Sequence, residues 1–250
     1  MTLIILNPMS KRLHNIIHPA LLYLIVFVLI VLVSWIGSVL EMRVAGYSQL
    51  TLRSVLGSQG IRWIVGNAAW TLSQAPVGNA VMLFMLVGMG RESGLFSSLS
   101  RLRNLSPRER TAMVIAAVSM LIVLLLVVTG IMSGSRLAIS VTGTFAGSPL
   151  AKGAVFLLML AVSVPSIVYG LATGRLKSAT DCVRAFASAV GEWAQFIVTM
   201  LMASQIIQTL EYTHLDALMH IGTKGMDVIS FLLYWLPLPV IMLINQKSRQ

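Results

Sequence analysis

The sequence predicts an all-α, polytopic integral membrane protein with about six transmembrane helices, and three observations support this prediction. Apolar residues make up 57% of the 250 residues, whereas charged residues make up only 10%. Soluble domains carry about 25% charged residues, so this chain has too few charges for a water-exposed surface. A bilayer removes that need, because the outward face of a membrane helix is apolar. Finally, the apolar residues gather in runs of about the 20 residues that a spanning helix needs.

Six such runs follow one another along the chain. We expect spans over about residues 19–40, 61–90, 112–132, 150–173, 185–210 and 226–244. No run adjoins a long polar segment, so residues 1–250 are expected to form a single membrane domain. The first run continues from Ala20 to Leu40 without a small-x-small cleavage pattern, which predicts an uncleaved span in place of a signal peptide.

The distribution of basic residues predicts the orientation of the chain. With six crossings and a cytoplasmic N-terminus, twelve of the eighteen lysines and arginines fall on the cytoplasmic side. This bias follows the positive-inside rule, and the segment from Arg91 to Arg110 contributes most to it. We therefore expect an inner-membrane protein with both termini in the cytoplasm and a full crossing over 61–90. The net charge of +10 is not arranged as a basic stripe with interleaved aromatics, so no nucleic-acid partner is expected.

The second run is interrupted at Ser73-Gln74-Ala75-Pro76. Pro76 lacks an N–H and pushes Ala75 away from helical geometry, which frees backbone carbonyls that need polar partners in hydrocarbon. Two interpretations remain open: a proline kink satisfied by neighbouring side chains, or a discontinuous helix that lines a binding site. The polar residues around the break are Asn67, Thr71, Ser73, Gln74 and Asn79.

The fifth run carries a second polar feature. Ser188, Glu192, Gln195 and Thr199 are spaced so that one continuous helix would place them within about 60° on one face. A carboxylate inside a membrane is costly and usually faces protein or water. Glu192 is accordingly either a carboxylate near the interface or a residue that couples protons or contacts substrate. Gln195 is a candidate substrate contact on the same face.

Other patterns predict structure more than chemistry. Ser106-Pro107-Arg108-Glu109 is a helix start with a capping box. The chain has no catalytic signature such as HExxH, GxSxG or a phosphate-binding loop, so neither an enzyme nor a cofactor is expected. The spacing of four acidic and histidine residues does not assure the convergence that a metal needs, and no metal site is predicted; these residues are Glu211, His214, Asp216 and His220.

Several short segments, spread over most of the chain, carry a resemblance to a known family through their sequence and their order. They are His18-Pro19, Ser34-Trp35-Ile36-Gly37-Ser38, Gly60-Ile61-Arg62-Trp63, Ala75-Pro76-Val77-Gly78, Gly88-Met89-Gly90-Arg91-Glu92-Ser93-Gly94-Leu95, Ser106-Pro107-Arg108-Glu109-Arg110, Ser148-Pro149-Leu150-Ala151-Lys152-Gly153, Pro165-Ser166-Ile167-Val168-Tyr169-Gly170 and Leu176-Lys177-Ser178. In this order they resemble the AbgT family, the p-aminobenzoyl-glutamate transporters.

The resemblance implies inverted repeats whose hairpins meet at a central site, in a dimer. It carries over to Arg62, to the break at Ala75-Pro76-Val77-Gly78 and to Lys177-Ser178. The Trp-Ser-Asn segment of the family aligns with Tyr212-Thr213-His214. The Gly-, Ser- and Asn-rich segment of the family and its Gly-Asp-Ser-Val-Thr-Asn stretch have no counterpart, so this chain is expected to be a shortened member.

Two functions therefore remain as hypotheses. The first is a reduced AbgT-like secondary transporter, a homodimer that moves a small carboxylated aromatic or folate-related solute with proton or ion coupling. Arg62 or the polar break, including Pro76, would meet the anion, and Glu192 would couple protons. The second is a non-transporting half-protein or accessory subunit that assembles with another membrane protein. In both cases the lipid bilayer is a partner.

Overall fold

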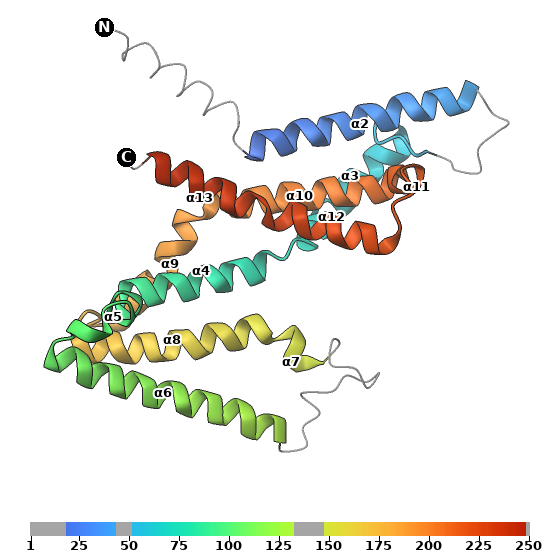
Figure 1. The fold of residues 1–250 in the computed structure, drawn as a ribbon. Coiled ribbons are helices and arrows are strands. Elements are labelled where there is room, and N and C mark those ends of the chain that lie inside the picture. The colour runs from blue at the N-terminus through green and yellow to red at the C-terminus, as the bar shows by residue number, and fades with distance from the viewer. Residues whose placement is uncertain (1–18, 44–51, 133–147, 249–250) are drawn as a thin grey trace, which may run out of the picture. The chain divides into compact units, whose positions relative to one another are not determined.

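A computed structural model describes residues 19–43, 52–132 and 148–248, and these residues form helices without any strand (Figure 1). This architecture confirms the all-α prediction. The helices are α2 (Pro19–Arg43), α3 (Ser58–Ser73), α4 (Val77–Glu92), α5 (Leu95–Leu99), the 3₁₀ helix η1 (Leu102–Asn104), α6 (Pro107–Met132), α7 (Pro149–Lys152), α8 (Ala154–Thr173), α9 (Ala179–Glu192), α10 (Ala194–Thr213), α11 (Leu215–Leu218), α12 (Thr223–Trp235) and α13 (Pro237–Ser248).

The helices long and apolar enough to cross a membrane confirm the prediction of about six spans. Within the described ranges, five segments pass this test: Pro19–Leu40, Ser58–Glu92, Pro107–Gly130, Ala154–Thr173 and Thr223–Leu243. A sixth is obtained when the bent pair of Ala179–Glu192 and Ala194–Thr213 is taken as one span. Helices such as α2 and α6 expose leucine, isoleucine and valine along their length, which suits a lipid environment.

The break in the second span lies where the sequence predicts it. Helix α3 ends at Ser73 and α4 begins at Val77, with Gln74 as the C-cap of α3. The N–H of Ala75 donates to the Leu72 carbonyl at 3.3 Å, and not to the Thr71 carbonyl that a continuing helix would offer it. Pro76 has no N–H for the next position, so the helical ladder stops here.

The fifth span differs from the predicted continuous helix over 185–210. Trp193 is non-helical, with φ −103° and ψ 14°, and separates α9 from α10. Ser188 and Glu192 therefore lie on α9, whereas Gln195 and Thr199 lie on α10, and the predicted single polar stripe is wrong. The physical reason is tertiary packing, because the Trp193 indole stacks on Phe84 of α4 with ring centroids 5.5 Å apart.

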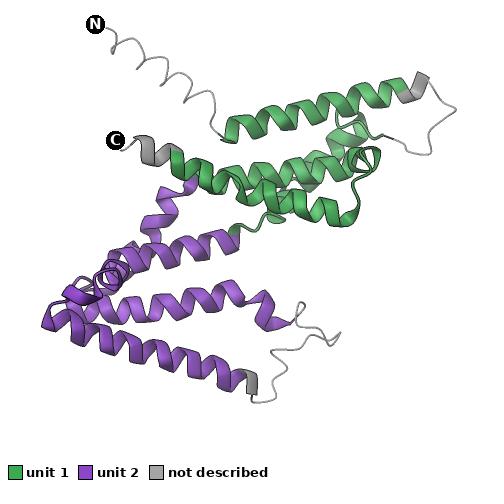
Figure 2. Cartoon of the chain, in the orientation of Figure 1, with its two compact units in different colours: residues 1–77, 195–250 green, residues 78–194 purple. Residues whose placement is uncertain are grey.

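The chain divides into two compact units (Figure 2). Unit 1 comprises residues 1–77 and 195–250, and unit 2 comprises residues 78–194. The prediction of one membrane domain over 1–250 concerns how the two units combine, and it stays a prediction.

In unit 1, α10 lies at the centre of the packing. Its residues Ala203, Ile206, Ile207 and Leu210 are buried together with Tyr23 of α2 and with residues of α11 and α12. The Tyr23 hydroxyl donates a hydrogen bond of 2.7 Å to the Leu233 carbonyl, which ties α2 to α12. Burial of this polar group without such a partner would be unfavourable.

In unit 2, α6 and α8 pack side by side, with Ala112 and Ala116 of α6 buried around Tyr169 of α8. Helices α4 and α9 approach so closely that a Cβ atom on Gly88 would clash with the Ala185 carbonyl oxygen. Only glycine fits at this crossing without displacing backbone.

Two capping boxes start helices in unit 2. The Ser106 N–H donates to the Glu109 carboxylate at 2.9 Å, and the Glu109 N–H donates back to the Ser106 hydroxyl, which confirms the predicted start of α6. The same arrangement joins Ser178 and Asp181 at the start of α9. The second box was missed, although Ser178 followed three residues later by Asp181 is the sequence signal for it.

Candidate functional site

The helix break in unit 1 is held by α10. Because the Ala75 N–H has turned away, the Thr71 carbonyl has only a weak 3.4 Å contact from Gln74 within its own segment. The Ser204 hydroxyl of α10 donates to this carbonyl, and the Gln205 amide donates to the Thr71 hydroxyl at 2.6 Å. Thr71 and Ser204 are both buried. The freed carbonyl thus finds its polar partner on α10, and we call Thr71, Ser204 and Gln205 the break contact.

The side chains near the break do not bond to the freed Thr71 carbonyl. Asn67 donates to the Trp63 carbonyl at 2.9 Å, and Ser73 donates to the Trp70 carbonyl at 2.7 Å, so both bond within α3. Gln74 and Asn79 are exposed, and Pro76 is half-buried in the connection between α3 and α4. The interpretation of a proline kink satisfied by neighbouring side chains is therefore wrong about the donor, because Ser204 of α10 reaches the freed carbonyl.

The candidate residues of α3 lie on two faces. At 3.6 residues per turn, Arg62 and Ser73 fall within about 20° of each other, and Asn67 and Gln74 fall on a face about 140° away. Arg62 is exposed in the first turns of the helix. The structure therefore aligns these residues along one helix without gathering them into one pocket.

An aromatic and cationic cluster lies beside Arg62. Trp63 stacks on Tyr212 of α10 with ring centroids 4.2 Å apart and planes 17° from parallel. The Arg53 guanidinium lies 6.0 Å from the Tyr212 ring centroid, at the outer limit of a cation–π contact. The Arg53 N–H also donates to the Thr213 carbonyl at 3.3 Å, which fixes this segment against the end of α10. We call Arg53, Trp63 and Tyr212 the aromatic cluster.

Glu192 has a specific partner in unit 2. Its carboxylate accepts a hydrogen bond of 2.8 Å from the Arg91 guanidinium, so the end of α9 is joined to the last turn of α4. The Glu192 side chain is 23% exposed, and that of Arg91 is 50% exposed. A charge-assisted hydrogen bond of this length is stronger than a neutral one. Glu92, also near Arg91, makes only a 4.0 Å contact.

A small cavity of about 230 Å³ lies between the end of α4 and the start of α9. Its lining carries both signs of charge, with Glu92 and Asp181 on one hand and Arg175 and Arg184 on the other. The Asp181 carboxylate takes part in the capping box of α9, because it accepts hydrogen bonds from the backbone N–H groups of Lys177 and Ser178, each at 3.0 Å. The mixed charges do not favour a simple anion or a simple cation.

Several of these groups were missed as site residues. Arg91 entered the sequence analysis through the distribution of basic residues and the family-like segment from Gly88 to Leu95, and not as a site residue. Ser204 and Gln205 lie off the predicted stripe of the fifth span. A contact such as that of Gln205 with Thr71, 134 residues apart, leaves no local signal in one sequence. Of the remaining candidates, Gln195 is exposed in the first turn of α10. The histidine and acidic residues of 211–220 form no group able to hold a metal within the part of the chain that the structure describes.

The helices and the broken span together define a multi-pass α-helical membrane protein. The family model of the AbgT transporter family matches residues 98–245, which is more than half of the chain. The chain belongs to the AbgT transporter family, and its class is therefore that of membrane transporters. Neither the curated proteins nor the solved structures contain a significant match to the chain.

Proposed function

We propose that the chain is a secondary transporter for a small carboxylated aromatic solute of the p-aminobenzoyl-glutamate or folate-related kind. The observation that carries this proposal is the aromatic cluster. Stacked rings offer a further aromatic ring a face or an edge to pack on, and the adjacent guanidinium offers a charge for a carboxylate. Arg62 precedes Trp63 directly and adds a second guanidinium close to the same end of α3.

The break in the second span supplies the element that changes conformation in this proposal. Transporters commonly bind solutes where a spanning helix is discontinuous. Asn67, Ser73, Gln74, Pro76 and Asn79 surround this break, and in the proposed cycle their polar groups meet the solute when the break opens. The proposal also includes Gln195 as a substrate contact at the start of α10.

For the coupling step we propose Glu192. Protonation of its carboxylate would remove the negative charge of the Arg91–Glu192 pair. The attraction between the two side chains would then fall, and the contact between α4 and α9 would weaken. The Glu192 side chain is 23% exposed, so a proton from the solvent can reach its carboxylate.

The proposed setting is the inner membrane, with both termini in the cytoplasm, and the proposed assembly is a homodimer or a complex with a partner membrane subunit. Eight lysines and arginines support this orientation, because all lie on the segments 91–110 and 175–184 that connect the spans of unit 2 on one side. Labelling of Arg103→Cys and Lys224→Cys in a Cys182→Ser background tests it. An impermeant maleimide should reach position 224 but not position 103 in intact cells, and the opposite result would contradict the orientation.

The function is tested by reconstituting the purified chain into liposomes and measuring uptake of labelled p-aminobenzoyl-glutamate with and without an imposed pH gradient. We expect gradient-dependent uptake by the native chain. Tyr212→Ala should reduce uptake at least tenfold, and Arg62→Gln should raise the KM. Arg103→Gln, a surface arginine of η1, is the matched control and should behave as the native chain.

The coupling role has its own control in the same assay. Glu192→Gln should abolish the response to the pH gradient, whereas Glu92→Gln, which changes a more exposed carboxylate near the same arginine, should retain it. Background uptake by the native chain over a range of carboxylated aromatic solutes would contradict the transport proposal. It would leave the accessory-subunit hypothesis, to be pursued by isolating a partner.

A further inference from the structure

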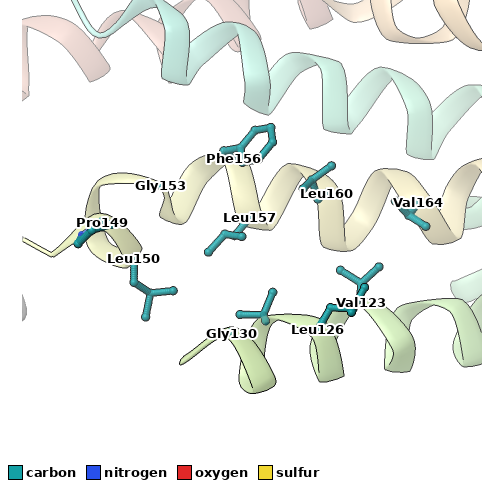
Figure 3. Close-up of a pocket in the computed structure, with 11 residues that line it drawn as sticks. Val123, Leu126, Gly130, Pro149, Leu150, Gly153, Phe156, Leu157, Leu160 and Val164 are labelled. Atoms are coloured by element: carbon teal, nitrogen blue, oxygen red, sulfur yellow. The ribbon is translucent and has the colours of Figure 1, made fainter. Parts of the chain in front are cut away.

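An apolar groove of about 550 Å³ lies between α6 and α8 in unit 2, away from the charged end of that unit. Figure 3 shows Val123 and Leu126 of α6 and Leu157 of α8 directed into the space between the two helices. Every side chain that lines the groove is a hydrocarbon or a glycine. Both helices are membrane-spanning segments, so the medium beside the groove is acyl chain and not water.

The length of the groove matches one leaflet. From Gly153, the N-cap residue of α8, to Val164 on α8, the lining residues span about 16 Å at 1.5 Å per residue. The hydrocarbon core of a bilayer is about 30 Å thick, so half of it is about 15 Å. A groove of this length suits a single acyl chain of a phospholipid.

A lysine lies next to one end of the groove. Lys152 stands between the lining residues Leu150 and Gly153 and just before the span that begins at Ala154. Its side chain is exposed, and among the described residues no carboxylate forms an ion pair with it. A lysine directly beyond a spanning helix lies at the level of the lipid headgroups.

We propose that this groove is a binding site for an anionic phospholipid, with one acyl chain between α6 and α8 and the headgroup phosphate at the Lys152 ammonium. The groove provides shape and apolar contact for the chain, and the lysine provides preference for a net negative headgroup. The groove shares no residue with the break contact, the aromatic cluster or the Arg91–Glu192 pair, and the proposal does not depend on the transported solute.

The test is native mass spectrometry of the full chain in mild detergent, titrated with phosphatidylglycerol or with phosphatidylcholine of the same acyl chains. The native chain should bind its first phosphatidylglycerol about fivefold more tightly than phosphatidylcholine, as one lysine near a headgroup predicts. Lys152→Ala should remove this preference. Lys224→Ala, which changes an exposed lysine in the first turn of α12, should keep it.

A second pair of variants tests the groove itself. Leu157→Trp fills the space between the helices and should weaken binding of both lipids, whereas Leu158→Trp alters a neighbouring leucine that is 50% exposed and outside the groove and should not. Equal affinity of the native chain for the two lipids overturns the proposal. The proposal is also overturned if Lys152→Ala and Lys224→Ala change the preference for phosphatidylglycerol equally. This comparison of the two lysine variants tests the proposal even if Leu157→Trp does not fold.

Discussion

The side chains of Arg91 and Glu192 meet at 2.8 Å although 101 residues separate them in the sequence. The pair connects the last turn of α4 with the last turn of α9, three residues beyond the point where Gly88 allows the two helices to touch. The same two helices are therefore joined once by backbone proximity and once by charge. Variants of Arg91 and Glu192 test the contribution of the charges, and Gly88→Ala tests that of the backbone contact.

The Arg91–Glu192 pair should contribute modestly to stability. In a double-mutant cycle with Arg91→Gln and Glu192→Gln, we expect a coupling free energy of about 0.5 kcal/mol, because half-exposed pairs are screened by solvent. The measurement is the free energy of unfolding in mixed micelles. A matched cycle with Arg91→Gln and Glu92→Gln should give no coupling within error, and equal values for the two cycles would contradict the assignment of Glu192 as the specific partner.

Gly88→Ala should destabilise the chain by about 1–3 kcal/mol, since the added methyl group would press against the Ala185 backbone and force the helices apart. It should also abolish the coupling between Arg91 and Glu192. Gly66→Ala is the control, because nothing lies within 4 Å of a Cβ atom at that position. There the gain in helix propensity makes alanine neutral or slightly stabilising.

Ser204→Ala should destabilise the chain by about 1–2 kcal/mol, because it leaves the buried Thr71 carbonyl without its donor from α10. Ser166→Ala removes an equally buried hydroxyl, but that hydroxyl bonds only the Val162 carbonyl of its own helix. We expect its effect to stay within about 0.5 kcal/mol. If thermal unfolding shows a similar loss of stability for both variants, the break contact contributes no more to stability than a hydrogen bond within one helix.

Ser178→Ala should cost about 1 kcal/mol through loss of the N-cap of α9. Hydrogen exchange should then report faster exchange of the Asp181 amide, whose hydrogen bond to the Ser178 hydroxyl is lost. Ser100→Ala, an exposed serine that bonds the Ser97 carbonyl, is the control. Unchanged protection at Asp181 would be incompatible with the capping role.

The features of this fold that could be predicted from the sequence are those with local causes. Apolar runs of bilayer length predict the spans, Pro76 predicts the end of α3, and Ser106 with Glu109 predicts the start of α6. Each depends on residues within one or two turns of each other. The family resemblance, which depends on the order of such local segments, is confirmed for the same reason.

The features that escaped prediction depend on contacts between distant segments. Trp193 interrupts a run with no proline, and its partner Phe84 lies more than a hundred residues away. Likewise, the freed Thr71 carbonyl could have been met by any of several nearby polar side chains. Those side chains instead bond within α3, because a helix already offers Asn67 and Ser73 a carbonyl one turn back.

The bare backbone surface at Gly88 has a mechanical consequence. Helices usually interlock through ridges of side chains, which resist sliding as strongly as separation. Gly88 presents no side chain to the Ala185 backbone of α9. We therefore expect little resistance to sliding of the two helices along their axes. The nearby Arg91–Glu192 pair is screened by solvent and adds only a weak restraint. We therefore expect α4 and α9 to slide along each other over a short distance with little resistance from either contact.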